Sequence, residues 1–144
     1  MTAYFDTNVL IAAVLARHPQ HLVAAAALRK VHSRDIQGWI SAHGLAELYA
    51  VLTRVPLTPP VYPGEAWQML ERDVFPYFEV VPLSGDEYRE TLRRCATAGW
   101  TGGRVYDALH VAAARKADCR QIYTFNLRHF RELADDLAGR MQTP

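Results

Sequence analysis

Short apolar runs alternate along the chain with longer segments that carry apolar residues at helical spacing. The runs that predict strands are Ala3 to Phe5, Gly38 to Ile40, Tyr77 to Leu83 and Ile122 to Phe125. The segments that predict helices are Asn8 to Leu15, Gln20 to His32, one after Ser41, one from Gly64, one from Ser84 to near Gly99, Arg104 to Ala117 and Leu127 to Leu137. Because parallel strands need helical crossovers, the alternation predicts a three-layer α/β/α fold with a short central parallel sheet of about four to five strands.

The helix after Ser41 has the clearest amphipathic pattern. Its apolar residues at i, i+3, i+4 and i+7 predict a core-facing stripe of Leu45, Leu48, Tyr49 and Leu52. Glu47 lies off this stripe, and Ser41 is the expected N-cap. Four prolines between Pro56 and Pro63 then end the helix.

Length and composition favour one compact domain over residues 1–144. The chain is 50% hydrophobic and 22% charged, which suits a globular domain with its own core. No segment approaches the roughly 20 apolar residues that span a bilayer, and the start shows no charged lead before a long apolar stretch. We therefore expect a cytoplasmic protein without membrane contact, in which Cys95 and Cys119 stay reduced.

The charge pattern is compatible with nucleic-acid binding but does not demand it. The formal net charge is only +1, yet the basic residues are fourteen arginines and two lysines. The planar guanidinium of arginine suits bidentate contact with phosphate. A GC-rich genome explains the same bias equally well.

Three carboxylates and one amide stand beside the predicted strands and helix starts. Asp6 follows the first strand, Asn126 follows the fourth, and Glu47 and Asp107 lie in early turns of their helices. In open α/β sheets, ligands bind beyond the carboxyl ends of the strands, where these four side chains would meet if right-handed crossovers place both helix starts there. Like charges held together call for a cation.

The expected ligands select a hard metal ion. They are all oxygens, and no cysteine or histidine stands at metal-ligand spacing, which favours Mg²⁺, or Mn²⁺ as a substitute, over zinc. Such ions activate water and stabilise charge in the in-line hydrolysis of phosphodiesters. The pattern therefore indicates metal-dependent nuclease chemistry.

Each acidic residue also has an ordinary explanation. Asp6 can cap the following helix, Glu47 can pair with Arg54, and Asp107 can interact with its helix dipole. His110, one turn after Tyr106, is more typical of a core or surface histidine than of a catalytic base. These explanations leave the order of the four sites along the chain unaccounted for.

The motifs resemble those of PIN-domain ribonucleases, and most closely the VapC-type toxins of type II toxin–antitoxin systems. The segments that carry the resemblance are Tyr4-Phe5-Asp6-Thr7-Asn8, Ala46-Glu47-Leu48, Val105-Tyr106-Asp107-Ala108-Leu109-His110 and Tyr123-Thr124-Phe125-Asn126. They stand in the family's order and cover nearly the whole chain. The resemblance implies a PIN-like fold and a Mg²⁺-dependent endoribonuclease, with an antitoxin partner and a homodimer.

Residue by residue, the resemblance implies that Asp6, Glu47 and Asp107 are the catalytic, metal-binding acids. Thr7, Asn8 and Thr124 match supporting polar positions of the family. Asn126 departs from it, because many members carry an aspartate there, and a single tightly held ion is the expectation. Arg104, after Gly102-Gly103 at a helix start, and Arg128, just past Asn126, are candidate contacts to phosphate or the RNA backbone, and an ordinary surface arginine is the alternative for each.

Three alternatives stay open at this point. The chain can be an RNA-processing PIN nuclease without an antitoxin, or a non-catalytic RNA-binding PIN module that lost one charge at Asn126. A receiver-like domain phosphorylated on Asp6 is disfavoured, because a receiver's phosphorylated aspartate normally ends the third strand.

Overall fold

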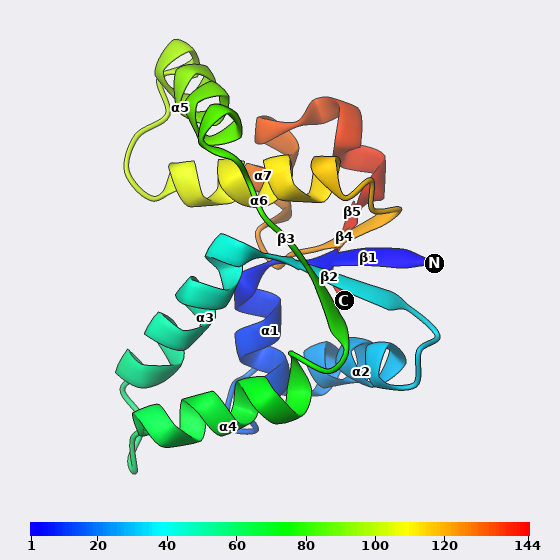
Figure 1. Ribbon diagram of the computed structural model, residues 1–144, viewed down its shortest axis with the longest axis vertical. Coiled ribbons are helices and arrows are strands. Elements are labelled where there is room, and N and C mark those ends of the chain that lie inside the picture. The colour runs from blue at the N-terminus through cyan, green and yellow to red at the C-terminus, as the bar shows by residue number, and fades with distance from the viewer.

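A five-stranded parallel sheet lies at the centre of the computed structural model, which describes all residues from Met1 to Pro144 (Figure 1). The strand order is β3-β2-β1-β4-β5, and every neighbouring pair is parallel. The strands are β1 (Thr2–Phe5), β2 (Gln37–Ser41), β3 (Phe78–Val81), β4 (Gln121–Tyr123) and β5 (Met141–Gln142).

Helices cover both faces of the sheet, which confirms the predicted three-layer fold. One face carries α1 (Thr7–Val14), α2 (His21–His32), α3 (Ala42–Arg54) and α4 (Pro63–Asp73). The other carries α5 (Gly85–Ala98), α6 (Arg104–Lys116), α7 (Leu127–Leu133) and the 3₁₀ helix η1 (Asp135–Arg140) (Figure 1). None of the helices has the length and apolar character that crossing a membrane would require.

Strand β1 contributes buried side chains to both faces of the sheet. Side chains alternate between the faces of a strand, so Ala3 and Phe5 join the core beneath α1 to α4, whereas Tyr4 joins the core beneath α6 and α7. All three are fully buried. Tyr4 thereby points toward α6, which matters for the site described below.

The strand order places a topological switch point between β1 and β4. From β1 the chain crosses to β2 and β3 on one side, and only later to β4 and β5 on the other. Loops leaving strands on the two sides of such a point diverge and open a crevice at their carboxyl ends. Asp6 directly follows β1, and Thr124 and Asn126 follow β4.

Local capping signals in the sequence are confirmed. The Ser41 hydroxyl accepts a hydrogen bond from the Gly44 amide at the start of α3. Ser84 and Glu87 form a reciprocal capping box at the start of α5, and Gly99 ends this helix with φ of 73°. These contacts are local in sequence, so pattern alone could locate them.

Two expectations about helix surfaces and ends were wrong. Leu45, Leu48 and Leu52 of the predicted stripe pack on the core, but Tyr49 is 40% exposed. The helix expected from Leu127 to Leu137 ends at Leu133, where Ala134 takes an extended φ of −152° before η1. This break lets the chain return to pair β5 beside β4, a tertiary demand that helical spacing does not encode.

Gly38 is expected to be intolerant of a side chain. An added Cβ would lie 2.7 Å from Phe78 Cε1 and 2.9 Å from Val31 Cγ1. We expect Gly38→Ala to lower the free energy of unfolding by roughly 1 to 3 kcal/mol in denaturant titration, because an overpacked core strains its neighbours. Gly64→Ala is the control, since nothing lies within 4 Å of its added Cβ; an equal loss there would contradict the packing argument.

Candidate functional site: an acidic cluster around a buried histidine

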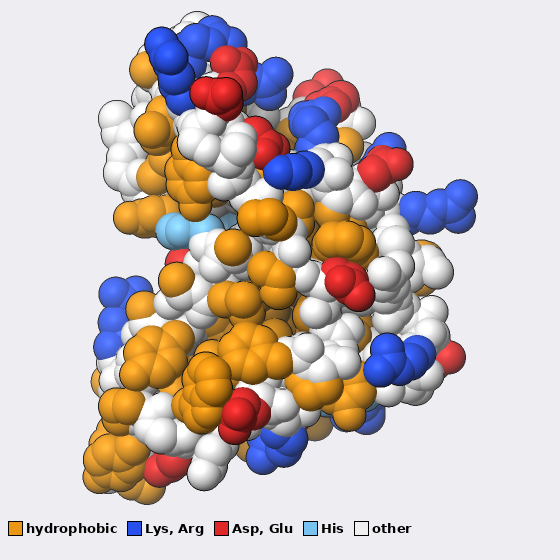
Figure 2. Space-filling view, viewed as in Figure 1, with side chains coloured by type: hydrophobic (Ala, Val, Ile, Leu, Met, Phe, Trp, Pro, Cys, Tyr) orange, Lys and Arg blue, Asp and Glu red, His pale blue; other side chains and the backbone are white.

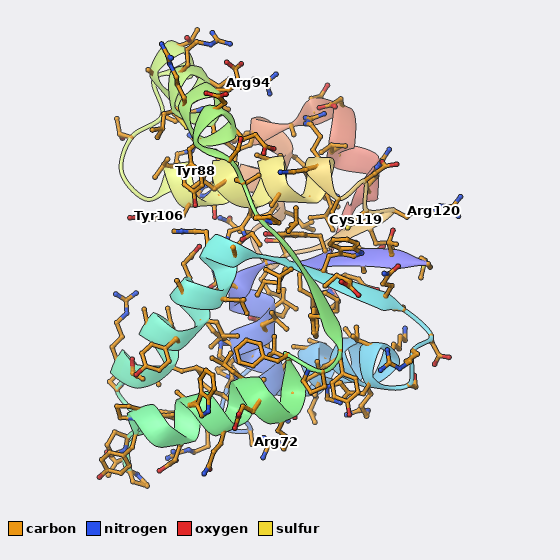
Figure 3. The ribbon with its side chains drawn as sticks, viewed as in Figure 1. Arg72, Tyr88, Arg94, Tyr106, Cys119 and Arg120 are labelled. Carbon is orange, nitrogen blue, oxygen red and sulfur yellow. The ribbon has the colours of Figure 1, made fainter.

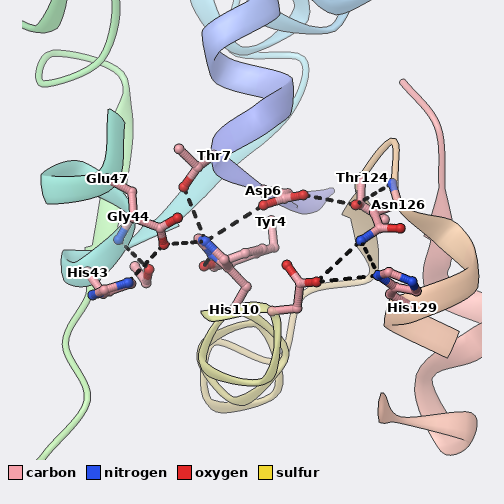
Figure 4. A network of polar contacts seen from close by, with 12 residues as sticks. Tyr4, Asp6, Thr7, His43, Gly44, Glu47, His110, Thr124, Asn126 and His129 are labelled. Carbon is pink, nitrogen blue, oxygen red and sulfur yellow. Dashed lines mark hydrogen bonds and ion pairs between the residues drawn. The ribbon is translucent and has the colours of Figure 1, made fainter. Parts of the chain in front are cut away.

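Asp6 is the most deeply buried of the predicted acids, at 2% exposure. It occupies the N-cap position of α1, yet its side chain makes no capping hydrogen bond there. Instead, Oδ2 accepts a hydrogen bond of 2.9 Å from the Thr124 hydroxyl at the end of β4 (Figure 4). Helix capping therefore does not explain this aspartate.

The surroundings of Asp6 disfavour its charged form. Burial raises the pKa of the Asp6 carboxyl, and the negative charge of Glu47 raises it further. The charge of His110 and the hydrogen bond from Thr124 act in the opposite direction without cancelling the effect. A nearby cation would relieve this cost.

Thr124 and Asn126 bring the end of β4 to the same place. The backbone N–H of Asn126 donates to Thr124 Oγ1 at 3.0 Å, which leaves the hydroxyl proton of Thr124 for Asp6. The Asn126 side chain donates from Nδ2 to Asp107 Oδ2 at 3.2 Å. Asn126 Nδ2 also lies 2.9 Å from Nδ1 of His129. Asn126 thus connects Asp6, through its backbone and Thr124, with Asp107, through its side chain.

Asp107 reaches the crevice from the first turn of α6. It is partly buried, and burial raises the pKa of its carboxyl. The charge of Asp6 is the next largest cause and also raises it, as does that of Glu47, while His110 and His129 lower it. The coupling shows that the acids act on each other electrostatically although they come from different elements.

Glu47 joins the cluster from α3, and its partners are two histidines rather than Arg54. Its Oε1 atom lies 2.9 Å from Nε2 of His110 and 2.9 Å from Nε2 of His43. Only the first contact has hydrogen-bond geometry, so the His43 nitrogen is left without a hydrogen-bond partner. The side chain of Glu47 keeps about a quarter of its surface exposed.

His110 is the centre of this network. At 1% exposure it contacts the Tyr4 hydroxyl through Nδ1 at 2.6 Å and the Thr7 hydroxyl through Nε2 at 3.1 Å, besides Glu47 (Figure 4). Asp6 Oδ1 lies 3.7 Å from the same Nε2. Burial alone would lower the pKa of His110, but its bond to Glu47 and the surrounding carboxylates raise it overall.

From the sequence, His110 was expected to be an ordinary core or surface histidine. It is indeed buried, but it lies inside the acidic cluster. The available signal was its position three residues after Asp107, which sets both on one face of α6. Its long-range partners Tyr4, Thr7 and Glu47 carry no local mark.

Of the remaining predicted residues, some belong to the hydrogen-bond network and others lie outside it. Thr7 is in the network, whereas Asn8 is exposed and makes no side-chain hydrogen bond. Arg104 pairs with Glu132 at 2.9 Å and lies over the Trp100 ring. Arg128 is 87% exposed and pairs with the same glutamate at 3.3 Å. Asn8, Arg104 and Arg128 therefore make no hydrogen bond or ion pair with the acidic cluster.

The donor atoms of the cluster suit a hard divalent cation, although the side chains are not arranged as a complete coordination shell. Its donors are carboxylate oxygens, and burial, together with neighbouring negative charge, raises the pKa values of Asp6 and Asp107. No three acidic, histidine or cysteine side chains converge as a ready-made metal site. Glu47 is instead turned to the histidines, so Asp6 and Asp107 are the direct candidates for holding the ion.

Comparison with known proteins agrees with this architecture. The PIN domain family model matches residues 3–136. Ribonuclease VapC40 of Mycobacterium tuberculosis is 33% identical over 124 residues, which cover 85% of each chain. Ribonuclease VapC27 of the same organism is 36% identical over 110 residues, 76% of this chain and 74% of that relative. The chain therefore belongs to the PIN-domain family, and these relatives within it are VapC ribonucleases.

Solved structures share the fold at lower identity. Mycobacterium tuberculosis VapC20, a Sarcin-Ricin loop cleaving toxin, has a TM-score of 0.69 at 18% identity, covering 88% of this chain and 92% of that one. VapBC2 from Rickettsia felis, bound to a DNA fragment from its promoter, also scores 0.69 at 18% identity over 99% and 98% of the two chains. The resemblance inferred from the four sequence motifs is confirmed.

Proposed function

We propose that this protein is a Mg²⁺-dependent endoribonuclease, with Mn²⁺ as a substitute ion, and the toxin of a type II toxin–antitoxin module. The observation that carries the proposal is that Thr124 and Asn126, which follow β4, bind Asp6 and Asp107 respectively, and that the pKa of each carboxyl is raised. The ribonuclease relatives at 33% and 36% identity support the chemistry. The proposal places the protein in the cytoplasm.

Asp6 and Asp107 would hold the ion, with Glu47 beside them. When bound, the ion would activate water and stabilise charge on the leaving oxygen of the phosphodiester. Thr124 fixes Asp6, and Asn126 restrains Asp107. Glu47, which is hydrogen-bonded to His110, would take a proton from the attacking water. Because Asn126 adds no charge, we propose one tightly held ion.

The experiment is cleavage of end-labelled tRNA and ribosomal RNA fragments by purified protein. We expect discrete cuts with Mg²⁺ that disappear with chelator and in Asp107→Asn. Glu65→Gln is the matched control, since Glu65 is an exposed acid in the first turn of α4. Cuts that persist in Asp107→Asn, or disappear equally in Glu65→Gln, would contradict the assignment of the site.

A second function, RNA binding without catalysis, is favoured by one observation: Asn126 supplies an amide where a further charge would strengthen metal binding. Under this alternative, folded protein free of antitoxin leaves every RNA intact and binds it equally well with chelator. A PIN nuclease that processes RNA without an antitoxin would cleave but have no inhibitor.

An antitoxin partner and a homodimer complete the proposal. Antitoxin dependence is tested by co-expressing the product of any small reading frame found next to the gene, which should co-purify with this chain and suppress cleavage. Sedimentation of the toxin alone is expected to give the mass of two chains. A monomer that cleaves RNA unaffected by the neighbouring product would support the processing nuclease instead.

A further inference from the structure

Tyr106 is a half-exposed aromatic residue at the start of α6. The residue is 48% exposed. One face of its ring stacks on the His43 ring of α3, with 5.2 Å between ring centroids and 12° between planes. The ring is therefore held in a defined orientation while much of its surface faces solvent.

This stacked pair borders the acidic cluster. His43 Nε2 lies 2.9 Å from Glu47 Oε1, and the His43 ring contacts the His110 ring edge-on at 6.4 Å. Tyr106 itself precedes Asp107 in the chain. Figure 3 shows Tyr106 at the edge of the molecule between α3 and α6, and Figure 2 shows a notch there with a histidine on its wall.

We propose that Tyr106, backed by His43, is a stacking platform for an unpaired nucleobase of single-stranded RNA. This inference rests on the proposed ribonuclease function, since the cut phosphate would lie at the neighbouring carboxylates. Bases inside a duplex are already stacked on each other, whereas an unpaired base offers a free face to an aromatic ring. The platform therefore makes the substrate an RNA loop or single strand.

Position favours RNA over a protein as the ligand of Tyr106. The pair is continuous with Glu47 and His110, so an RNA strand that follows this side of the acidic cluster would pass the Tyr106 ring. The Tyr106 ring also needs no rearrangement, because His43 already fixes it. A preordered ring loses less conformational entropy on binding than a mobile one.

The test measures binding of a short single-stranded RNA that the protein cleaves, labelled with 2-aminopurine and studied with Ca²⁺ in place of Mg²⁺ to limit cutting. A stacked base is worth about 1 to 3 kcal/mol, so Tyr106→Leu is expected to weaken binding roughly 5- to 150-fold. The change in 2-aminopurine fluorescence on binding should be lost as well. Tyr106→Phe, which keeps the ring, should recover both.

Tyr62→Leu is the matched control, since Tyr62 is 58% exposed and lies at the start of α4. It should bind RNA as the parent protein does, and all variants should share one thermal unfolding midpoint. RNA that is cleaved normally but bound equally by Tyr106→Leu would overturn the platform and leave the nuclease intact. A Tyr106→Leu protein that binds RNA normally but no longer binds the antitoxin would also overturn the platform. A parent protein that neither binds nor cleaves RNA would overturn both proposals.

Discussion

Asp6→Asn is expected to abolish RNA cleavage and, in metal-free protein, to raise the thermal unfolding midpoint at neutral pH. The loss of activity should be at least about a thousandfold in kcat/KM, because an ion that stabilises charge in the transition state contributes several kcal/mol. Asparagine retains the shape of aspartate and an oxygen for the Thr124 hydroxyl, but it lacks the charge that would hold the ion.

The gain in stability follows from the raised pKa of Asp6. Burial and Glu47 make its charged form costly in the folded chain, and asparagine resembles the neutral form. The buried charge that would hold the ion therefore lowers the stability of the metal-free protein, a common cost of a functional site. Equal loss of activity and of stability in Asp6→Asn would indicate a structural role for this carboxylate.

The same shifts set the sign of the pH dependence. The pKa values of Asp6 and Asp107 lie above their usual 3.8, and that of His110 lies above 6.5. The folded chain therefore binds more protons than the unfolded chain between each usual value and its raised one, so stability falls as pH rises through the raised values. Calorimetry of metal-free protein should show this fall, Mg²⁺ should reduce it, and Asp6→Asn should flatten its carboxylate part.

His110→Leu is expected to lower the free energy of unfolding by roughly 2 to 4 kcal/mol, because it leaves the fully buried Tyr4 hydroxyl and the Thr7 hydroxyl without their partner. Cleavage should fall by about 10- to 100-fold even in fully folded protein, the usual effect of removing a group that orients a metal site. Denaturant titration and cleavage rates give the two measurements.

The double variant Tyr4→Phe/His110→Leu separates these effects. Removing both partners of a buried hydrogen bond costs less than removing one. Tyr4→Phe should therefore recover part of the stability lost in His110→Leu, by about 1 to 2 kcal/mol. It should not recover cleavage, since Glu47 still lacks the imidazole that orients it. Recovery of cleavage along with stability would mean that His110 acts only through the fold.

Sequence reasoning located Asp6 and Asp107 correctly relative to their strand and helix, because each stands beside a sharp change in hydrophobic pattern. The N-cap at Ser41 and the helix start at Ser84 were also predicted, because both depend on contacts three residues apart. Tyr49 and the end of α7 were misjudged, because packing against distant elements decides exposure and length there.

Local periodicity and residue type were enough to predict which segments are strands and helices, the layered fold and the oxygen-rich chemistry at the strand ends. Tertiary packing brings Tyr4, Thr7 and Glu47 to one histidine and stacks Tyr106 on His43. His110 lies 106 residues from Tyr4 and 63 from Glu47. Contacts over such separations arise when helices and strands pack together, and a single sequence leaves no periodic trace of them.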